Sequence, residues 1–253
     1  MPSSKTPLAI PKLTPTHIQH ANDCAELLLN GISFETGKEI ESDFYFLHTF
    51  SSTAHHYVNG THQQITWSQP IYHSLIITAK LKAMLRLKHQ LDFQQFEKLI
   101  EINIHQFIKD LSDTKKPVEL TLAKFTYDCG RELVSRQVRT KAGFRIPLAS
   151  RILFYAIPQA SFFNFSNALA SELQLQSRPQ TSIFNFYKIM RAGYDLNLPN
   201  LPDFSTLQSK GGSYQKIHSL IKNTDWWQRR VFDIALLLHL NITKSLNPLP
   251  QIP

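Results

Sequence analysis

The residues best suited to chemistry form a dense basic run in the middle of the chain. Six cations fall within twenty-one residues, and Glu132 is the one acid among them. Guanidinium groups on a rigid support suit phosphate binding, because their planar donors match its oxygens. The run therefore predicts an anion-binding surface, against the alternative of a solvated face or pairing with distant acids. Its cations are Arg131, Arg136, Arg139, Lys141, Arg145 and Arg151.

The charge of the whole chain points the same way. Its 253 residues contain 27 Lys and Arg against 19 Asp and Glu, a formal charge of +8. Such a balance favours a polyanionic partner, with nucleic acid ahead of an anionic membrane surface. Many soluble proteins are simply basic, so incidental charge remains an alternative.

Other reactive residue types lack the spacing of a known site. Five histidines fall within twenty-six residues, but without H-E-x-x-H spacing we expect surface or capping roles and no metal. Lys210-Gly211-Gly212-Ser213 lacks the order of a phosphate loop, and no nucleotide or catalytic motif predicts a cofactor. Cys129 has no matching His-Asn pattern, so we expect a buried thiol. The histidines are His48, His55, His56, His62 and His73.

Carboxylates suited to a DNA-processing enzyme, the alternative function, are few in this sequence. Asp128, Glu132 and Asp225 are the only candidates, and they are dispersed along the chain. In the last apolar stretch, helical spacing directs Trp227 inward and leaves Arg229 and Arg230 at the edge.

A buried helix must position the basic run. The stretch Ile152 to Ile157 is apolar, and Pro147 and Pro158 bracket it. Proline suits the first turn of a helix and cannot continue one, so we expect a helix over residues 147–157. Because this helix is apolar nearly all round, it should lie in the core.

Helical spacing and capping residues recur along the rest of the chain. Phe44 to Phe50 fits a helix better than a strand, although both remain open. Residues 197–212 contain two prolines and two glycines, which predicts a long surface loop. Further helices are expected at 14–30, 68–88, from 91 to the loop at 112–117, at 118–139 with an interruption near Cys129-Gly130, and at 166–175, 181–194, 214–221 and 224–240.

These elements predict a mainly α, multi-helix globular domain of about eight to ten helices. Residues 1–13, which are rich in proline, should form a flexible N-terminal arm, and residues 244–253 a tail. Between them, residues 14–243 form a single α-helical domain or two lobes, 14–117 and 118–243.

Composition also restricts the compartment. Cys24 and Cys129 are too far apart and too few for a disulfide framework, which suggests a reducing environment. The N-terminus lacks the apolar centre of a signal peptide, and no stretch of about 18 apolar residues exists. We therefore expect a cytoplasmic protein without a membrane span.

The segment Leu148 to Asn164, L-A-S-R-I-L-F-Y-A-I-P-Q-A-S-F-F-N, resembles one region of the 8-oxoguanine DNA glycosylase-like proteins. These belong to the helix-hairpin-helix glycosylase superfamily, and the similarity in helix order extends over about residues 130–240. The resemblance implies an all-α fold that binds duplex DNA, rather than RNA, and flips a base into a cleft.

The sequence departs from the family at the positions that do its chemistry. Arg151 stands where the pattern has Lys, and Asn164 where it has an activating Asp. Arginine cannot form a Schiff base and Asn cannot take the proton. Ala142-Gly143 is all that remains of the glycine-rich hairpin. We therefore expect a basic nucleic-acid-binding protein without lyase activity, through Arg136, Arg139, Lys141, Arg145 and Arg151. The alternatives are a glycosylase or nuclease with a divergent site, or a protein-interaction scaffold.

Overall fold

The computed structural model describes residues 8–59, 67–79, 81, 85–86, 90–133, 145–175, 179–208 and 213–242. Within these ranges the chain is helical, and its only β pairing is an isolated bridge between Ile32 and Glu39. The prediction of a mainly α, multi-helix domain is confirmed. The helices are α1 (Pro15–Leu29), α2 (Asp43–Asn59), α3 (Gln69–Thr78), α5 (Phe93–Leu111), α6 (Val118–Glu132), α7 (Ile146–Ala156), α8 (Asn167–Glu172), α9 (Pro179–Asn197), η3 (Leu198–Asn200), α10 (Ser205–Gln208), α11 (Ser213–Ile221) and α12 (Trp226–His239).

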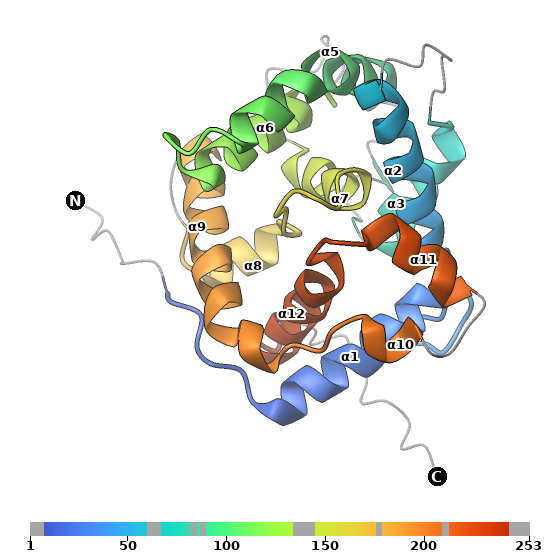
Figure 1. The fold of residues 1–253 in the computed structure, drawn as a ribbon, viewed down its shortest axis with the longest axis vertical. Coiled ribbons are helices and arrows are strands. Elements are labelled where there is room, and N and C mark those ends of the chain that lie inside the picture. Colours follow the sequence, from blue (N-terminus) through green and yellow to red (C-terminus); the bar gives the residue numbers. More distant parts are fainter. Residues whose placement is uncertain are drawn as a thin grey trace.

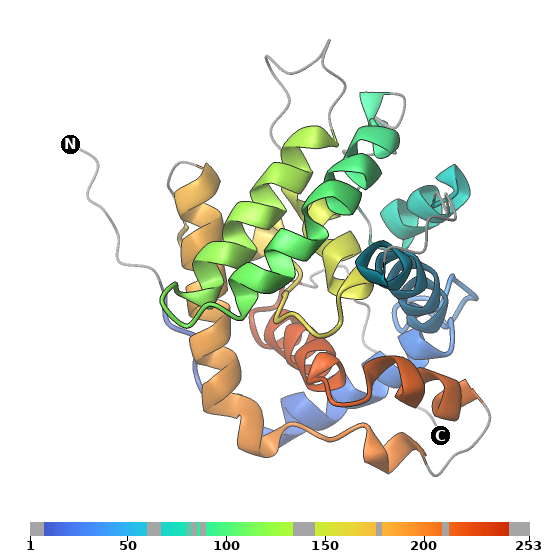
Figure 2. The same cartoon turned by 45° about the horizontal axis from the view of Figure 1, so that its top comes forward.

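Helix α7 lies at the centre of the fold, with the other long helices around it (Figure 1). Helices α2 and α6 pack directly against α7, and α5 packs against both of them. Helices α5 and α6 run side by side and are joined by the turn at residues 112–117 (Figure 2). Helix α9 packs against α6, and α1 packs along α12. Elements from both ends of the sequence therefore enclose one central helix.

The burial of α7 confirms the sequence prediction for this helix. Ten of its eleven residues are buried, and Arg151 is the exception. Pro147 sits in the first turn, where its missing N–H would have had no helical partner. The helix ends at Ala156, two residues before Pro158. Arg151 is thus the only side chain of α7 that is partly exposed to solvent.

Several helix boundaries follow from capping residues that the sequence identified. Thr14, Asp92 and Ser166 each accept a hydrogen bond of 3.0–3.2 Å from the backbone N–H three residues further on. Such bonds satisfy donors that have no partner in the first turn of a helix. Gly31 ends α1 with a φ of +76°, and a Cβ there would lie 2.8 Å from the carbonyl oxygen of Ile40. This position requires glycine.

Two expected helices are shorter in the structure than the sequence suggested. The helix expected to reach residue 88 is α3, which ends at Thr78, where the Leu81 N–H bonds to the Ile76 carbonyl and closes the last turn. The helix expected over 118–139 is α6, which ends at Glu132. The interruption expected near Cys129 and Gly130 is wrong, because α6 continues through both and Gly130 packs closely against Ile146 of α7. By contrast, the region near Phe44 to Phe50 belongs to the longer helix α2.

The predicted surface loop at 197–212 contains buried residues. Leu201, Phe204 and Leu207 are each less than 8% exposed, and η3 and α10 place them against the core. The ring of Phe204 meets that of Trp227 edge to face, with centroids 5.4 Å apart. Proline and glycine marked this segment as irregular, but its apolar residues anchor it to α12.

Residues 8–13, within the segment expected to be a flexible arm, pack along α9. The Leu13 N–H donates to Oδ1 of Asn197 at 2.7 Å, and Nδ2 of Asn197 donates to the Pro11 carbonyl at 3.3 Å. Ile10 is buried against Gly193, where a Cβ would approach its side chain to 2.7 Å. The absence of a side chain at Gly193 therefore makes room for this segment.

The buried apolar residues form one cluster that runs from Ile10 to Leu236. None of the helices within the described ranges combines the length and the apolar character needed to cross a membrane.

We predict that Leu153→Ala or Phe154→Ala lowers the free energy of unfolding by about 2–5 kcal/mol, because each change leaves a cavity in a packed interior. Both side chains are fully buried in α7. Urea unfolding gives the measurement. Ile102→Ala, at a residue that is 64% exposed on α5, is the matched control and should change stability by less than about 0.5 kcal/mol. A neutral effect of both core substitutions would contradict the central position of α7.

Candidate functional site

The loop at residues 157–165, which follows α7, is held from α12 by a buried arginine. Arg229 has no exposed surface. Its Nη1 donates to the carbonyl of Phe162 at 2.8 Å, and its Nη2 donates to the carbonyl of Pro158 at 2.6 Å. Its Nε donates to Oδ1 of Asp225 at 2.7 Å. Carbonyls outside a helix need such donors when they are buried, so these bonds fix the path of the loop.

The neighbouring Arg230 is also buried, which differs from the edge position expected for both arginines. Its Nε lies 2.6 Å from Oδ2 of Asp43, and the Tyr155 hydroxyl donates to the other carboxylate oxygen at 2.5 Å. Burial alone would lower the pKa of Arg230, but the Asp43 carboxylate raises it above its usual range. The partner lies 187 residues away, so helical spacing on α12 did not reveal it.

Asp233, one helical turn after Arg229 on α12, meets Asn164 from the loop. Its Oδ2 accepts hydrogen bonds from Nδ2 of Asn164 at 2.6 Å and from the backbone N–H of the same residue at 3.2 Å. Burial raises the pKa of Asp233 to about 6, although these bonds and the charges of Arg230 and Arg151 act to lower it. Asn164 and Arg151, the two positions singled out by the resemblance, therefore both act on one buried carboxyl.

This cluster has the chemistry of a proton-exchanging site. A carboxyl with a pKa near 6 can take up or release a proton close to neutral pH. The Oδ1 atoms of Asp233 and Asn164 are buried and have no hydrogen-bond partner among the described residues. Asp233 is 3% exposed, whereas Asn164 and Arg151 are half-buried. The sequence analysis did not identify Asp233 as a site residue. The only signal for it in the sequence is that an acid lies within an otherwise apolar helix.

Of the five predicted binding residues, Arg145 and Arg151 lie within the described part of the chain. Arg136, Arg139 and Lys141 lie outside the described residues. Arg145 is only 7% exposed, and burial lowers its pKa. Its backbone N–H donates to the Gly130 carbonyl at 3.3 Å, which ties the start of α7 to α6. Arg145 is thus buried at the start of α7, whereas Arg151 is half-buried.

The two residues that flank the stretch 134–144 of the basic run are tied to the fold by backbone hydrogen bonds. Leu133 accepts a hydrogen bond of 3.0 Å from the N–H of Asp92, and the Arg145 N–H donates to the Gly130 carbonyl at 3.3 Å. A second group of cations precedes Asp92 in the sequence and consists of Lys80, Lys82, Arg86 and Lys88.

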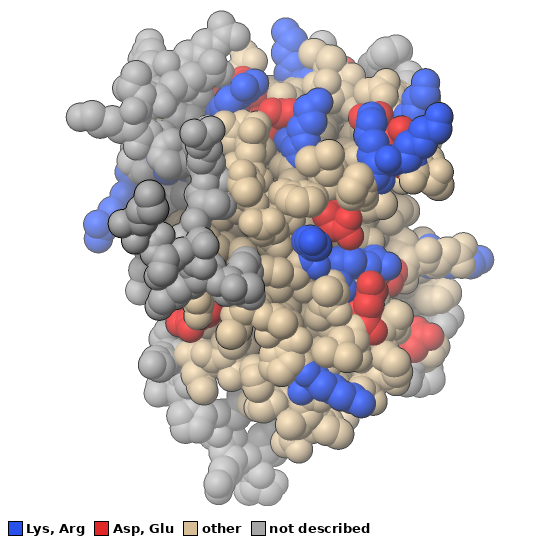
Figure 3. Space-filling model, turned by 90° about the vertical axis from the view of Figure 1, so that its left-hand side faces the viewer, with Lys and Arg blue, Asp and Glu red and all other residues tan. Residues whose placement is uncertain are grey.

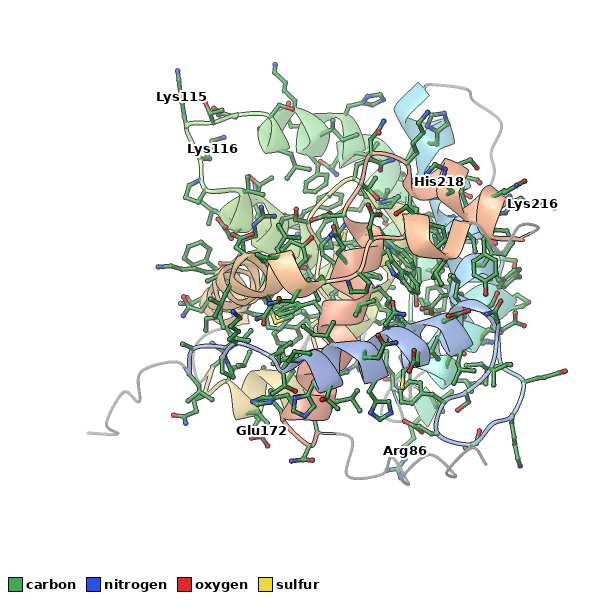
Figure 4. The ribbon with its side chains drawn as sticks, turned by 60° about the horizontal axis from the view of Figure 1, so that its bottom comes forward. Arg86, Lys115, Lys116, Glu172, Lys216 and His218 are labelled. Carbon is green, nitrogen blue, oxygen red and sulfur yellow. The ribbon has the colours of Figure 1, made fainter. Side chains whose placement is uncertain are left out.

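Positive charge is unevenly divided along the chain. Five Lys and Arg and no acid fall between Glu132 and Glu172, whereas the rest of the chain has 22 Lys and Arg against 19 acids. The face in Figure 3 shows blue and red side chains interspersed. In Figure 4, Arg86, Lys116 and Lys216 point outward from separate parts of the fold.

The acids considered for a DNA-processing enzyme do not meet. Asp128 and Glu132 lie one turn apart on α6, and burial raises the pKa of Asp128. Asp128 lines a groove of about 460 Å³ between α5 and α6, beside Lys124. Asp225 is on α12 and binds Arg229. In the described residues, no group of three or more His, Cys, Asp or Glu is placed to hold a metal ion.

The remaining motifs offer no second site. Cys129 is fully buried, and burial raises the pKa of its thiol, which agrees with the expected inert role. His62 and the residues Lys210 to Gly212 lie outside the described ranges. Elsewhere on α5, Glu97 is buried and accepts a hydrogen bond of 2.7 Å from the Tyr72 hydroxyl. Burial raises the pKa of Glu97 to about 7.

The chain matches no protein-family model, no curated protein and no solved structure. The resemblance to the glycosylase superfamily therefore remains a prediction from the sequence.

We predict that Asp233 makes the folded state less stable as pH rises from about 4 to 6. The pKa of this carboxyl is raised in the fold, so the folded state holds the proton more tightly than the unfolded chain does. The shift from 3.8 to about 6 corresponds to about 3 kcal/mol. Urea unfolding of the parent and of Asp233→Asn across this pH window measures the difference.

The Asn side chain stays neutral and can still accept the bonds from Asn164. The variant should therefore gain stability relative to the parent as pH rises through this window. Glu97→Gln is the control. Its stability relative to the parent should keep rising to about pH 7, because the pKa of Glu97 is raised to about 7. A parent–variant difference that stays constant from pH 4 to 7 would contradict the raised pKa of Asp233.

Proposed function

We propose that this protein binds nucleic acid, duplex DNA in particular, through phosphate contacts of Arg136, Arg139 and Lys141 in the basic run. The observation that carries the proposal is the spacing of charge along the sequence. These cations fall between Glu132 and Glu172, an interval that contains five Lys and Arg and no acid. Unneutralised Lys and Arg supply the sequence-independent part of DNA affinity.

The anchoring of the run supports the same proposal. Backbone hydrogen bonds at Leu133 and Arg145 attach the stretch 134–144 to the fold at both of its ends. Phosphate contacts made from such an attached segment can position the protein on a duplex. Arg145 and Arg151 are left out of the phosphate-binding set, because the first is buried and the second acts on Asp233.

We predict that binding to a short DNA duplex weakens steeply as salt rises, since each neutralised phosphate releases condensed counterion. The triple variant Arg136→Ala/Arg139→Ala/Lys141→Ala should bind more weakly, and its salt slope should be smaller by about 0.9 for each phosphate that the variant no longer neutralises. The preference among DNA sequences should change little, because phosphate contacts do not read bases. Fluorescence anisotropy across a salt series provides the measurement.

A matched control removes the same charge elsewhere. Lys115→Ala/Lys116→Ala/Lys216→Ala changes three exposed cations on the α5–α6 turn and on α11 (Figure 4). Parent-like binding by the control, with weak binding by the run variant, supports the proposal. Equal slopes for the two variants would reject the run as the phosphate-binding surface. Absence of DNA binding by the parent would favour an interaction scaffold, and a metal-dependent strand break would favour a nuclease.

We also propose that the protein lacks lyase activity. Arg151, at the position of the expected nucleophile, stays protonated and cannot form a Schiff base with an abasic sugar. Borohydride reduction in the presence of abasic-site DNA should therefore trap no covalent adduct on a denaturing gel. Trapping of an adduct would mean that a lysine elsewhere in the chain acts as the nucleophile.

A further inference from the structure

A cavity of about 430 Å³ lies where the 157–165 loop meets α6 and α9. Its volume falls within the range of small-molecule sites, about 300–1,000 Å³. Leu122, Phe163 and Tyr187 line this cavity but are almost fully covered, so its exposed apolar surface comes from Leu111 and Val118. Arg229 holds the loop in place from the core, so the wall that the loop contributes is fixed before any ligand arrives.

One wall carries a positioned cation. Nη1 of Arg191, on α9, donates to Oγ of Ser161 at 3.1 Å, and its Nε donates to Asp195 at 3.2 Å. The guanidinium also lies 5.8 Å from the centroid of the Tyr194 ring. The contact with Asp195 is an exposed ion pair, with Nε 3.1 Å from Oδ1. The two bonds use two of the five N–H groups, so the remaining three can donate to a carboxylate of a ligand.

The opposite charge comes from another helix. Glu119 lines the same cavity from the first turn of α6. No hydrogen bond or ion pair joins Glu119 to any described residue, and Gln159 in the cavity wall also has no described partner. Arg191 and Glu119 therefore line one cavity without neutralising each other. A ligand that carries both charges can satisfy both.

We propose that this cavity binds a free α-amino acid with an apolar side chain. The carboxylate faces Arg191, the ammonium faces Glu119, and the side chain packs against Leu111 and Val118. A nucleotide fits this charge pattern poorly, because its excess negative charge would lie near Glu119. This site shares no residue with the proposed phosphate-binding run, so either proposal can fail without the other.

Calorimetric titration with L-phenylalanine and two derivatives tests the assignment. N-acetyl-L-phenylalanine lacks the ammonium, and L-phenylalaninamide lacks the carboxylate. L-phenylalanine should bind saturably at one site, and each derivative should bind at least about tenfold more weakly, since each loses one charge-assisted contact. Failure of L-phenylalanine to saturate the parent protein at millimolar concentrations would overturn the proposal.

Substitutions test which side chain of the cavity binds each charged group of the ligand. Arg191→Gln should weaken binding of L-phenylalanine to the level of the amide, and Glu119→Gln should weaken it to the level of the acetyl derivative. Lys124→Gln, at an exposed cation on α6 outside this cavity, is the control and should leave all affinities unchanged. Circular dichroism verifies that each variant is folded. Equal binding by the parent, Arg191→Gln and Glu119→Gln would place the ligand elsewhere and reject the site.

Discussion

The buried guanidinium of Arg229 determines the shape of the centre of this fold. The loop that leaves α7 is not helical, so its carbonyls must find donors elsewhere, and leaving one buried and unsatisfied costs about 1–3 kcal/mol. Arg229 satisfies two of them, while Asp225 balances its charge. Because the loop is fixed in this way, Asn164 meets Asp233 on one side and Ser161 meets Arg191 on another.

The apolar architecture was largely predictable from the sequence, because its signals are local. The prolines around α7 and the caps at Thr14, Asp92 and Ser166 each act within a few residues. The buried charges were not predictable. Arginine usually lies at the surface, and the burial of Arg230 depends on Asp43, whose position relative to α12 no local pattern encodes. Asp233 was overlooked for the same reason, since Asn164 lies 69 residues before it.

Positive charge is concentrated in particular stretches of this sequence. Five Lys and Arg and no acid lie between Glu132 and Glu172, whereas the rest of the chain has 22 Lys and Arg against 19 acids. The two proposed ligands differ accordingly in net charge. A polyanion suits the acid-free basic run, whereas a ligand without net charge suits a cavity whose walls carry one charge of each sign. The net charge of the whole sequence thus predicts the first kind of partner and gives no sign of the second.

The packing of α1 along α12 also constrains how the chain can acquire its structure. During synthesis, Asp43 and the apolar face of α1 leave the ribosome long before α12 does, so neither can be covered by its final neighbour at that stage. Contacts between such distant segments slow folding, because a large loop must close before they contribute any stability. Early helices must therefore remain exposed, or be shielded by other proteins, until nearly the whole domain has been made.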